Sequence, residues 1–162
     1  MSDDVRLLIV GDGPVSEALL PMARALAWSA TVSTDLDEVT GALASTDAVV
    51  VTSHHDGLDA PTIKAALAAG TAYVGAMGSR KTQARRREWL LAHDVTEPAL
   101  DALHAPIGLD IGADAPGEIA VSILAEIVAV RRRPAAAVTS ISDRDGAIHP
   151  DRQPGEAYCP GG

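Results

Sequence analysis

Short apolar runs alternate with segments of helical periodicity over most of the chain. The runs predict β-strands, because each is bounded by small or polar residues and is too short for a typical helix. The segments between them place apolar residues three or four positions apart, which predicts amphipathic helices. The predicted strands are 6–10, 31–34, 47–52 and 72–76, and the predicted helices begin after Gly13, cover 36–44 and 59–69, follow Ser79 to about His93, and cover 97–103.

The stretch 104–126 closes this pattern with a loop and a long helix. Residues 106–112 alternate apolar residues with glycines and one aspartate, which predicts a short strand and a tight loop. The helix opens within 113–118, since Pro116 suits a first turn and a carboxylate at Glu118 favours the helix dipole. The buried stripe of this helix is predicted to contain Ile119, Ile123, Ile127 and Val130.

Alternation of strands and helices predicts an α/β fold, a Rossmann-like parallel sheet with helices on both faces in a single domain. The domain is expected to cover residues 1–133. After Pro134 the chain becomes rich in Ala, Pro, Gly, Asp and Ser. We therefore expect 134–162 to be a loosely packed or partly disordered tail.

Composition narrows the functional classes. Of 162 residues, 47% are hydrophobic and only 2% aromatic, so the core must be aliphatic. The net charge of −9 argues against a nucleic-acid partner. There is no apolar run near the roughly 18 residues of a membrane span and no pattern of a signal peptide, so we expect a cytoplasmic protein without a membrane partner. The single cysteine, Cys159, rules out an internal disulfide and gives no metal cluster.

The first strand leads into a glycine loop that is typical of dinucleotide binding. Gly11 and Gly13 give the GxG pattern, and Ser16 occupies the third small position, where it could pack closely or bond a phosphate. Asp35 follows the second strand at the distance where an acid meets a ribose hydroxyl. The structural alternative is that the glycines only permit a tight turn from strand to helix.

Polar residues follow the third and fourth strands as well. Ser53 and His54 are candidates for cofactor contact, and a solvated loop is the alternative. No metal site is predicted, because adjacent histidine side chains diverge. After the fourth strand, Gly78 lets the backbone come close to a ligand and Ser79 can cap a helix. Two cations come next, Arg80 and Lys81, which can pair with phosphate.

The loop of the stretch 104–126 adds further candidates, because a helix N-terminus can present free backbone N–H groups to a ligand. These candidates are Gly108, Asp110, Gly112 and Glu118. The alternative is a loop that only starts a core helix, and the sequence leaves open whether Glu118 would help or oppose an anion. Loops that follow parallel strands gather at one edge. We therefore expect a cleft suited to phosphate binding, built from 11–16, 53–56, 78–81 and 106–118.

Four segments of the chain resemble the C-terminal Rossmann domain of the XdhC/CoxI family. They are GDGPVSEAL at 11–19, VTSHHDGLD at 51–59, YVGAMGSRK at 73–81 and HAPIGLDIGADAPGEIAVSILAEI at 104–127. The similarity covers roughly residues 5–132, and GAIHP at 146–150 resembles the tail of the family. The departures are Ser16, where the family often has glycine, and Ser53-His54-His55, where it usually has Thr-His-Asp.

The resemblance implies a maturation factor for molybdenum hydroxylases of the xanthine dehydrogenase or carbon monoxide dehydrogenase type. Such factors bind the molybdenum cofactor, protect it while an oxo ligand is exchanged for sulfur, and hand it to the apo-enzyme. They are chaperones rather than catalysts, so no catalytic residue is assigned. The expected partners are an apo molybdenum hydroxylase, a cysteine desulfurase and a separately encoded protein that carries the family's N-terminal domain, and the apolar surface is compatible with a homodimer.

The residues alone support a second function, an NAD(P)-binding oxidoreductase or a nucleotide-sensing module. Gly11, Gly13 and Asp35 suit either function. No Tyr–Lys pair at catalytic spacing accompanies them, and a scaffold that only docks the target enzyme is a third interpretation. For the cofactor function, Arg80→Ala is expected to weaken binding more than Arg86→Ala.

Overall fold

The computed structural model describes residues 4–132. A single parallel sheet of five strands runs through this part of the chain, in the order β2-β1-β3-β4-β5. The strands are β1 Arg6–Val10, β2 Ser29–Ser33, β3 Ala48–Val51, β4 Tyr73–Ala76 and β5 Leu103–His104. The helices are α1 Pro14–Ala25, α2 Leu36–Ala42 with the 3₁₀ turn Leu43–Ser45, α3 Asp56–Ala68, α4 Arg80–Ala92, α5 Glu97–Leu100 and α6 Pro116–Arg132.

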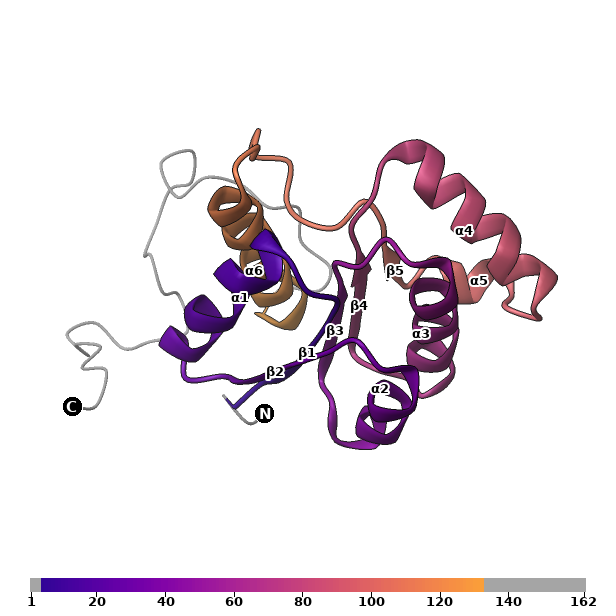
Figure 1. The fold of residues 1–162 in the computed structure, drawn as a ribbon, viewed down its shortest axis with the longest axis horizontal. Coiled ribbons are helices and arrows are strands. Elements are labelled where there is room, and N and C mark those ends of the chain that lie inside the picture. The colour runs from indigo at the N-terminus through magenta and orange to yellow at the C-terminus, as the bar shows by residue number, and fades with distance from the viewer. Residues whose placement is uncertain (1–3, 133–162) are drawn as a thin grey trace.

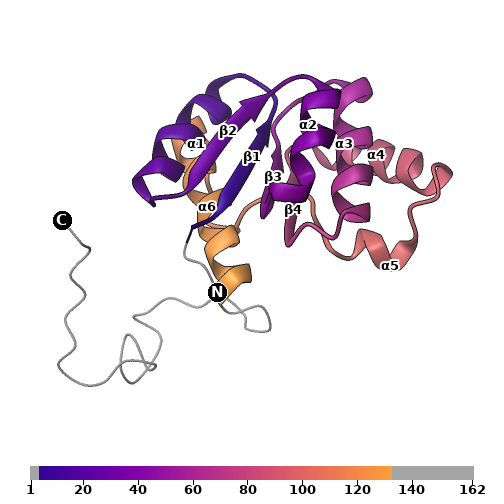
Figure 2. The same ribbon diagram turned by 90° about the horizontal axis from the view of Figure 1, so that it is seen from below.

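The helices cover both faces of the sheet (Figures 1 and 2). α1 and α6 pack together on one face, and α2 and α3 lie on the other. The loop between β5 and α6 crosses from the side of α4 to the side of α6 (Figure 1). This arrangement confirms the predicted α/β, Rossmann-like class.

Successive strand residues alternate between two apolar clusters, as the pleat of a β-strand requires. Leu7 and Ile9 face α1 and α6, whereas Leu8 and Val10 face the helices on the other side. Each residue of β3 is buried as well. Central parallel strands are covered on both faces, which explains why they read as uninterrupted apolar runs.

One predicted strand is wrong. The fifth strand is Leu103–His104, and 106–112 form a loop instead of the predicted strand and loop. Pro106 has no N–H to give to a sheet, and Gly108 and Gly112 take positive φ angles of 100° and 74°. Smaller boundary shifts occur at α3, which already begins at Asp56, and at α5, which ends at Leu100.

None of the helices within residues 4–132 combines the length and the apolar character that a membrane span requires. The predicted tail 134–162 lies outside the described residues, so its packing stays a prediction.

Candidate functional site

β2 pairs with one edge of β1, and β3 pairs with the other edge and is followed outward by β4 and β5. The direction of the strand order therefore reverses between β1 and β3. In open parallel sheets, ligands bind beyond the carboxyl ends of the strands at such a point. The predicted loops gather at this edge, but they line separate hollows instead of one cleft, and the predicted site residues are concentrated in two of these hollows. We call these two the glycine-loop hollow and the arginine hollow.

The glycine-loop hollow lies at the point where the strand order reverses. Its volume is about 700 Å³, and its lining includes Gly11, Asp12, Thr34, Ser53 and His54. The side chains of Asp12 and His54 are exposed and make no hydrogen bond or ion pair to any residue within 4–132. No Lys or Arg is among the residues that line this hollow.

Gly11 is required by packing between two loops. Its φ is 123°, and a Cβ atom built there would lie 2.5 Å from the backbone nitrogen of Ser53. No side chain fits at that distance, so only glycine lets the loop after β1 approach the loop after β3. The geometry at Gly11 therefore matches the structural alternative from the sequence, a glycine that permits a tight turn.

The other residues of the predicted dinucleotide motif contribute to neither hollow. Gly13 is the N-cap of α1. The buried hydroxyl of Ser16 donates to the carbonyl of Gly11 at 2.8 Å and contacts Thr52 Oγ1 at 2.8 Å. Asp35 caps α2, because its Oδ1 accepts the N–H of Glu38 at 2.9 Å. These groups complete the local fold.

The arginine hollow lies beyond β4 and β5. Its volume is about 490 Å³, and its lining includes Gly78, Arg80, Gly108, Asp110 and Gly112. The exposed Arg80 guanidinium makes no hydrogen bond or ion pair with another residue of the described region. A cation without an internal partner in a hollow is available to an anionic ligand.

Ser79 and Lys81 flank Arg80 in sequence but do not line either hollow. The hydroxyl of Ser79 accepts the N–H of Thr82 at 3.2 Å and caps α4, as the sequence predicted. Lys81 is exposed. The structure therefore brings one of the two predicted cations, Arg80, to the hollow.

The loop from Ile107 to Gly112 is held from two sides. Ile107 donates its N–H to the carbonyl of Ala76 at the end of β4, at 3.2 Å. Leu109 donates to the carbonyl of Ser122 on α6, also at 3.2 Å. A Cβ atom at Gly108 would lie 2.5 Å from the Ser122 hydroxyl oxygen. The loop therefore lies directly on α6, and its shape is fixed where it forms the hollow.

A carboxylate on the buried side of α6 supports the same loop. Glu126 Oε1 accepts the Tyr73 hydroxyl at 2.6 Å and the Gly108 N–H at 3.2 Å. It also lies 3.5 Å from His104 Nδ1, and the His104 ring stacks on Tyr73 with a centroid distance of 4.7 Å. Burial and the neighbouring carboxylate raise the pKa of Tyr73 far above its usual value. The phenol thus remains a donor to Glu126 throughout the physiological pH range.

Glu118 closes the start of α6. Its Oε2 accepts the backbone N–H groups of Asp114 and Ala115, both at 3.0 Å. This is the reach-back contact of a capping box. The sequence left open whether Glu118 would help or oppose an anion, and in the structure its carboxylate occupies two backbone N–H groups just before α6.

The two backbone hydrogen bonds lower the pKa of Glu118, which gives a pH-dependent contribution to stability. A lowered folded-state pKa means that the contribution is present above the unfolded pKa, about 4.3, and is lost as the pH falls through the folded value. We expect Glu118→Gln to unfold at a lower temperature than the wild type at pH 7, with the difference shrinking below about pH 4.

Thermal unfolding followed by circular dichroism at several pH values measures this difference. Glu88→Gln, which removes an exposed carboxylate from α4, controls for the change in net charge. A Glu118→Gln deficit that stays constant from pH 7 to pH 3 would contradict the capping role.

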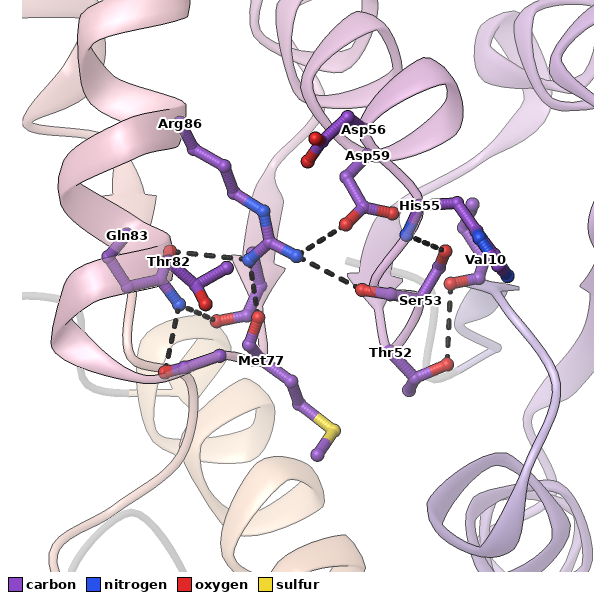
Figure 3. A network of polar contacts seen from close by, with 12 residues as sticks. Val10, Thr52, Ser53, His55, Asp56, Asp59, Met77, Thr82, Gln83 and Arg86 are labelled. Atoms are coloured by element: carbon purple, nitrogen blue, oxygen red, sulfur yellow. Dashed lines mark hydrogen bonds and ion pairs between the residues drawn. The ribbon is translucent and has the colours of Figure 1, made fainter.

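The buried Arg86 links a residue of each hollow, Ser53 of the glycine-loop hollow and Met77 of the arginine hollow (Figure 3). Its side chain is 3% exposed, and its Nη2 lies 2.5 Å from Asp59 Oδ2 and 3.0 Å from the carbonyl of Ser53. Its Nη1 donates to the carbonyl of Met77 and contacts Gln83. One guanidinium therefore ties the loop after β3 to the loop after β4.

The sequence did not identify Arg86 or Glu126. Arg86 lies in a run of three arginines, of which Arg85 and Arg87 are indeed half exposed and form surface ion pairs. The available signal was helical spacing, since Leu90, four residues after Arg86, marks the buried side of α4. Glu126 likewise lies three residues after the predicted stripe position Ile123, which places it beside the buried side of α6.

In residues 4–132, no group of three or more His, Cys, Asp or Glu side chains is placed to hold a metal ion. The groups available at this edge are instead the Arg80 guanidinium, which can pair with an anion, and the Asp12 carboxylate and His54 imidazole, which can form hydrogen bonds.

Comparisons with known proteins point to one family. A family model described as the XdhC Rossmann domain matches residues 7–127. Over 128 residues the chain is 29% identical to the molybdenum cofactor insertion chaperone PaoD of Escherichia coli, a match that covers 78% of this chain and 40% of PaoD. Over 89 residues it is 38% identical to a probable xanthine dehydrogenase subunit of Bacillus subtilis, covering 54% of this chain and 24% of that protein.

The fold agrees with a solved structure. A crystal structure of a xanthine dehydrogenase from Bacillus halodurans superposes with a TM-score of 0.63 at 23% identity, over 82% of this chain and 45% of that one. The chain thus spans less than half of each of these proteins.

Proposed function

We propose that this chain, which belongs to the XdhC family, binds the molybdenum cofactor at the carboxyl edge of its sheet and delivers it to an apo molybdenum hydroxylase. Two relatives support the proposal by their names, one a molybdenum cofactor insertion chaperone and the other a probable xanthine dehydrogenase subunit. The target would be an enzyme of the xanthine dehydrogenase or carbon monoxide dehydrogenase type.

The observation that carries the proposal is Arg80 in the arginine hollow. Molybdopterin bears a phosphate, and an arginine with no partner in the described region can bind phosphate through two parallel hydrogen bonds. Gly78 and Gly108 line the wall of the hollow, and a Cβ atom at either position would meet α4 or α6, so these glycines let the wall pack closely on the two helices. The volume, about 490 Å³, is within the range of about 300–1,000 Å³ that small-molecule sites occupy. The residues present therefore fit the group.

The chain's own contribution is to bind and orient. Arg80 would hold the phosphate, and the loop fixed by Glu126 and Ser122 would shape the wall beside it. The cofactor supplies the redox chemistry at molybdenum once it is in the target enzyme. A chaperone needs binding that is specific but reversible, and an open hollow at the sheet edge suits release to a partner.

The alternative, an NAD(P)-binding oxidoreductase or nucleotide-sensing module, finds less support in the geometry. The glycine loop carries the Asp12 carboxylate, Pro14 removes one N–H from the start of α1, and the Ser16 hydroxyl is bonded inward. A pyrophosphate at that position would lose hydrogen bonds and meet a like charge.

Delivery of the cofactor can be tested by reconstitution. An apo molybdenum hydroxylase is mixed with molybdenum cofactor, with and without the chain, in the presence of an excess of an unrelated protein. The proposal predicts faster recovery of hydroxylase activity with the chain. Equal recovery with and without it, including after addition of a cysteine desulfurase and of a protein carrying the family's N-terminal domain, would contradict it.

A further inference from the structure

The glycine-loop hollow differs from the arginine hollow in charge. It is lined by one carboxylate, Asp12, together with hydroxyl and imidazole groups from Thr34 and His54, and no cation lines it. Asp12 is exposed and has no hydrogen-bond or ion-pair partner within the described residues. A hollow of this kind repels phosphate and favours an uncharged ligand group that offers N–H donors.

The two hollows lie close enough for one ligand to reach both. Asp12 of the glycine-loop hollow follows β1 and Arg80 of the arginine hollow follows β4, and only β3 lies between these two strands. Two strand spacings amount to about 10 Å. Between the hollows, the buried Arg86 joins the carbonyls of Ser53 and Met77, so their relative position is fixed.

From these observations we infer that Asp12 binds the amino-pyrimidinone edge of the ligand's pterin, while Arg80 binds its phosphate. This inference rests on the proposed function. A pterin presents an amino group and a ring N–H side by side, and a carboxylate accepts both at once in a bidentate pair. The phosphate and this edge are at opposite ends of molybdopterin, and of the residues that line the two hollows only Arg80, in the arginine hollow, is a Lys or Arg.

Asp110 is the competing carboxylate, because it lines the arginine hollow. It shares that hollow with Arg80, where the phosphate is proposed to bind. A ligand held by Asp110 and Arg80 together would leave the glycine-loop hollow without a role. The variants Asp12→Asn and Asp110→Asn therefore form a matched pair.

Free pterins test the inference without the oxygen-sensitive cofactor. Binding of pterin-6-carboxylate is measured by fluorescence, beside the 2-oxo analogue lumazine-6-carboxylate, which replaces the amino donor by an acceptor. A site built around a donor rejects an analogue that lacks it. We expect the wild type to prefer the pterin by about tenfold or more, the value of one charge-assisted hydrogen bond. Asp12→Asn is expected to lose this preference and Asp110→Asn to keep it.

Three results would overturn the inference: equal binding of the two compounds by the wild type, a preference that survives Asp12→Asn, or a preference that is lost in Asp110→Asn. Guanosine monophosphate carries the same edge, so a guanine that binds through Asp12 when pterin does not would assign the hollow to a nucleotide instead. Gly57→Leu is a steric check, since Gly57 lines the hollow and a Cβ atom there meets open space. It should weaken pterin binding without affecting the fold.

Failure of the inference can be told apart from failure of the proposed function. If molybdenum cofactor binds but shows no dependence on Asp12, only the assignment of the pterin edge is wrong. If the cofactor does not bind at all, the proposed function is wrong.

Discussion

Replacing Arg86 by alanine is expected to lower the free energy of unfolding by about 3–5 kcal/mol, the cost of removing one partner from a buried ion pair. The Asp59 carboxylate, which is 2% exposed, would be left buried without its partner. The carbonyls of Ser53 and Met77 would also lose a donor. Urea denaturation followed by circular dichroism measures the change.

Arg85→Ala is the matched control. Arg85 precedes Arg86 on α4 and pairs with Asp56 at 2.9 Å, but both side chains are more than half exposed. An exposed pair contributes at most about 1 kcal/mol, so the control should stay close to the wild type. Similar losses for the two variants would contradict the role of Arg86 as the link between the two loops.

Replacing Arg80 by alanine is expected to weaken binding of molybdenum cofactor by about 10- to 100-fold, the value of a hydrogen-bonded charge pair with phosphate. Stability should be unchanged, because Arg80 contacts no partner among the described residues. A binding titration and a thermal melt on the same preparation separate the two effects.

The comparison between Arg80 and Arg86 that the sequence suggested is unsuitable, because the buried Arg86 supports the fold. Arg24→Ala is the better control, since Arg24 is exposed in the last turn of α1, at the end of the helix away from the hollows. Equal loss of affinity in Arg80→Ala and Arg24→Ala would indicate a diffuse effect of charge in place of a contact in the arginine hollow.

The fold was predictable because its central strands are buried on both faces and read as apolar runs. β3 is such a run, and the prediction differs from the structure by only a residue at each end. β5 was missed because it has two residues, only half buried, at the edge of the sheet. A strand of two residues has no periodic pattern, whereas the apolar residues after Pro106 do alternate. The strand was therefore predicted within the loop instead.

The candidate site was predictable in its loops but not in its individual side chains. Asp35, Ser79 and Glu118 have the chemistry of ligand contacts, yet they cap α2, α4 and α6. In a sequence, a carboxylate or hydroxyl at the start of a helix can indicate a helix cap or a ligand contact equally well. Only the way neighbouring elements pack decides between these two roles. The same is true of Arg86, because its partner Asp59 is 27 residues away in the sequence.

The most direct test of the proposed function is an anaerobic titration of the purified chain with molybdenum cofactor, in parallel with NAD(H) and NADP(H). We expect the molybdenum cofactor to bind and the nicotinamide cofactors not to bind. Binding of a nicotinamide cofactor alone would contradict the proposal and assign the edge of the sheet to a redox or nucleotide-sensing function.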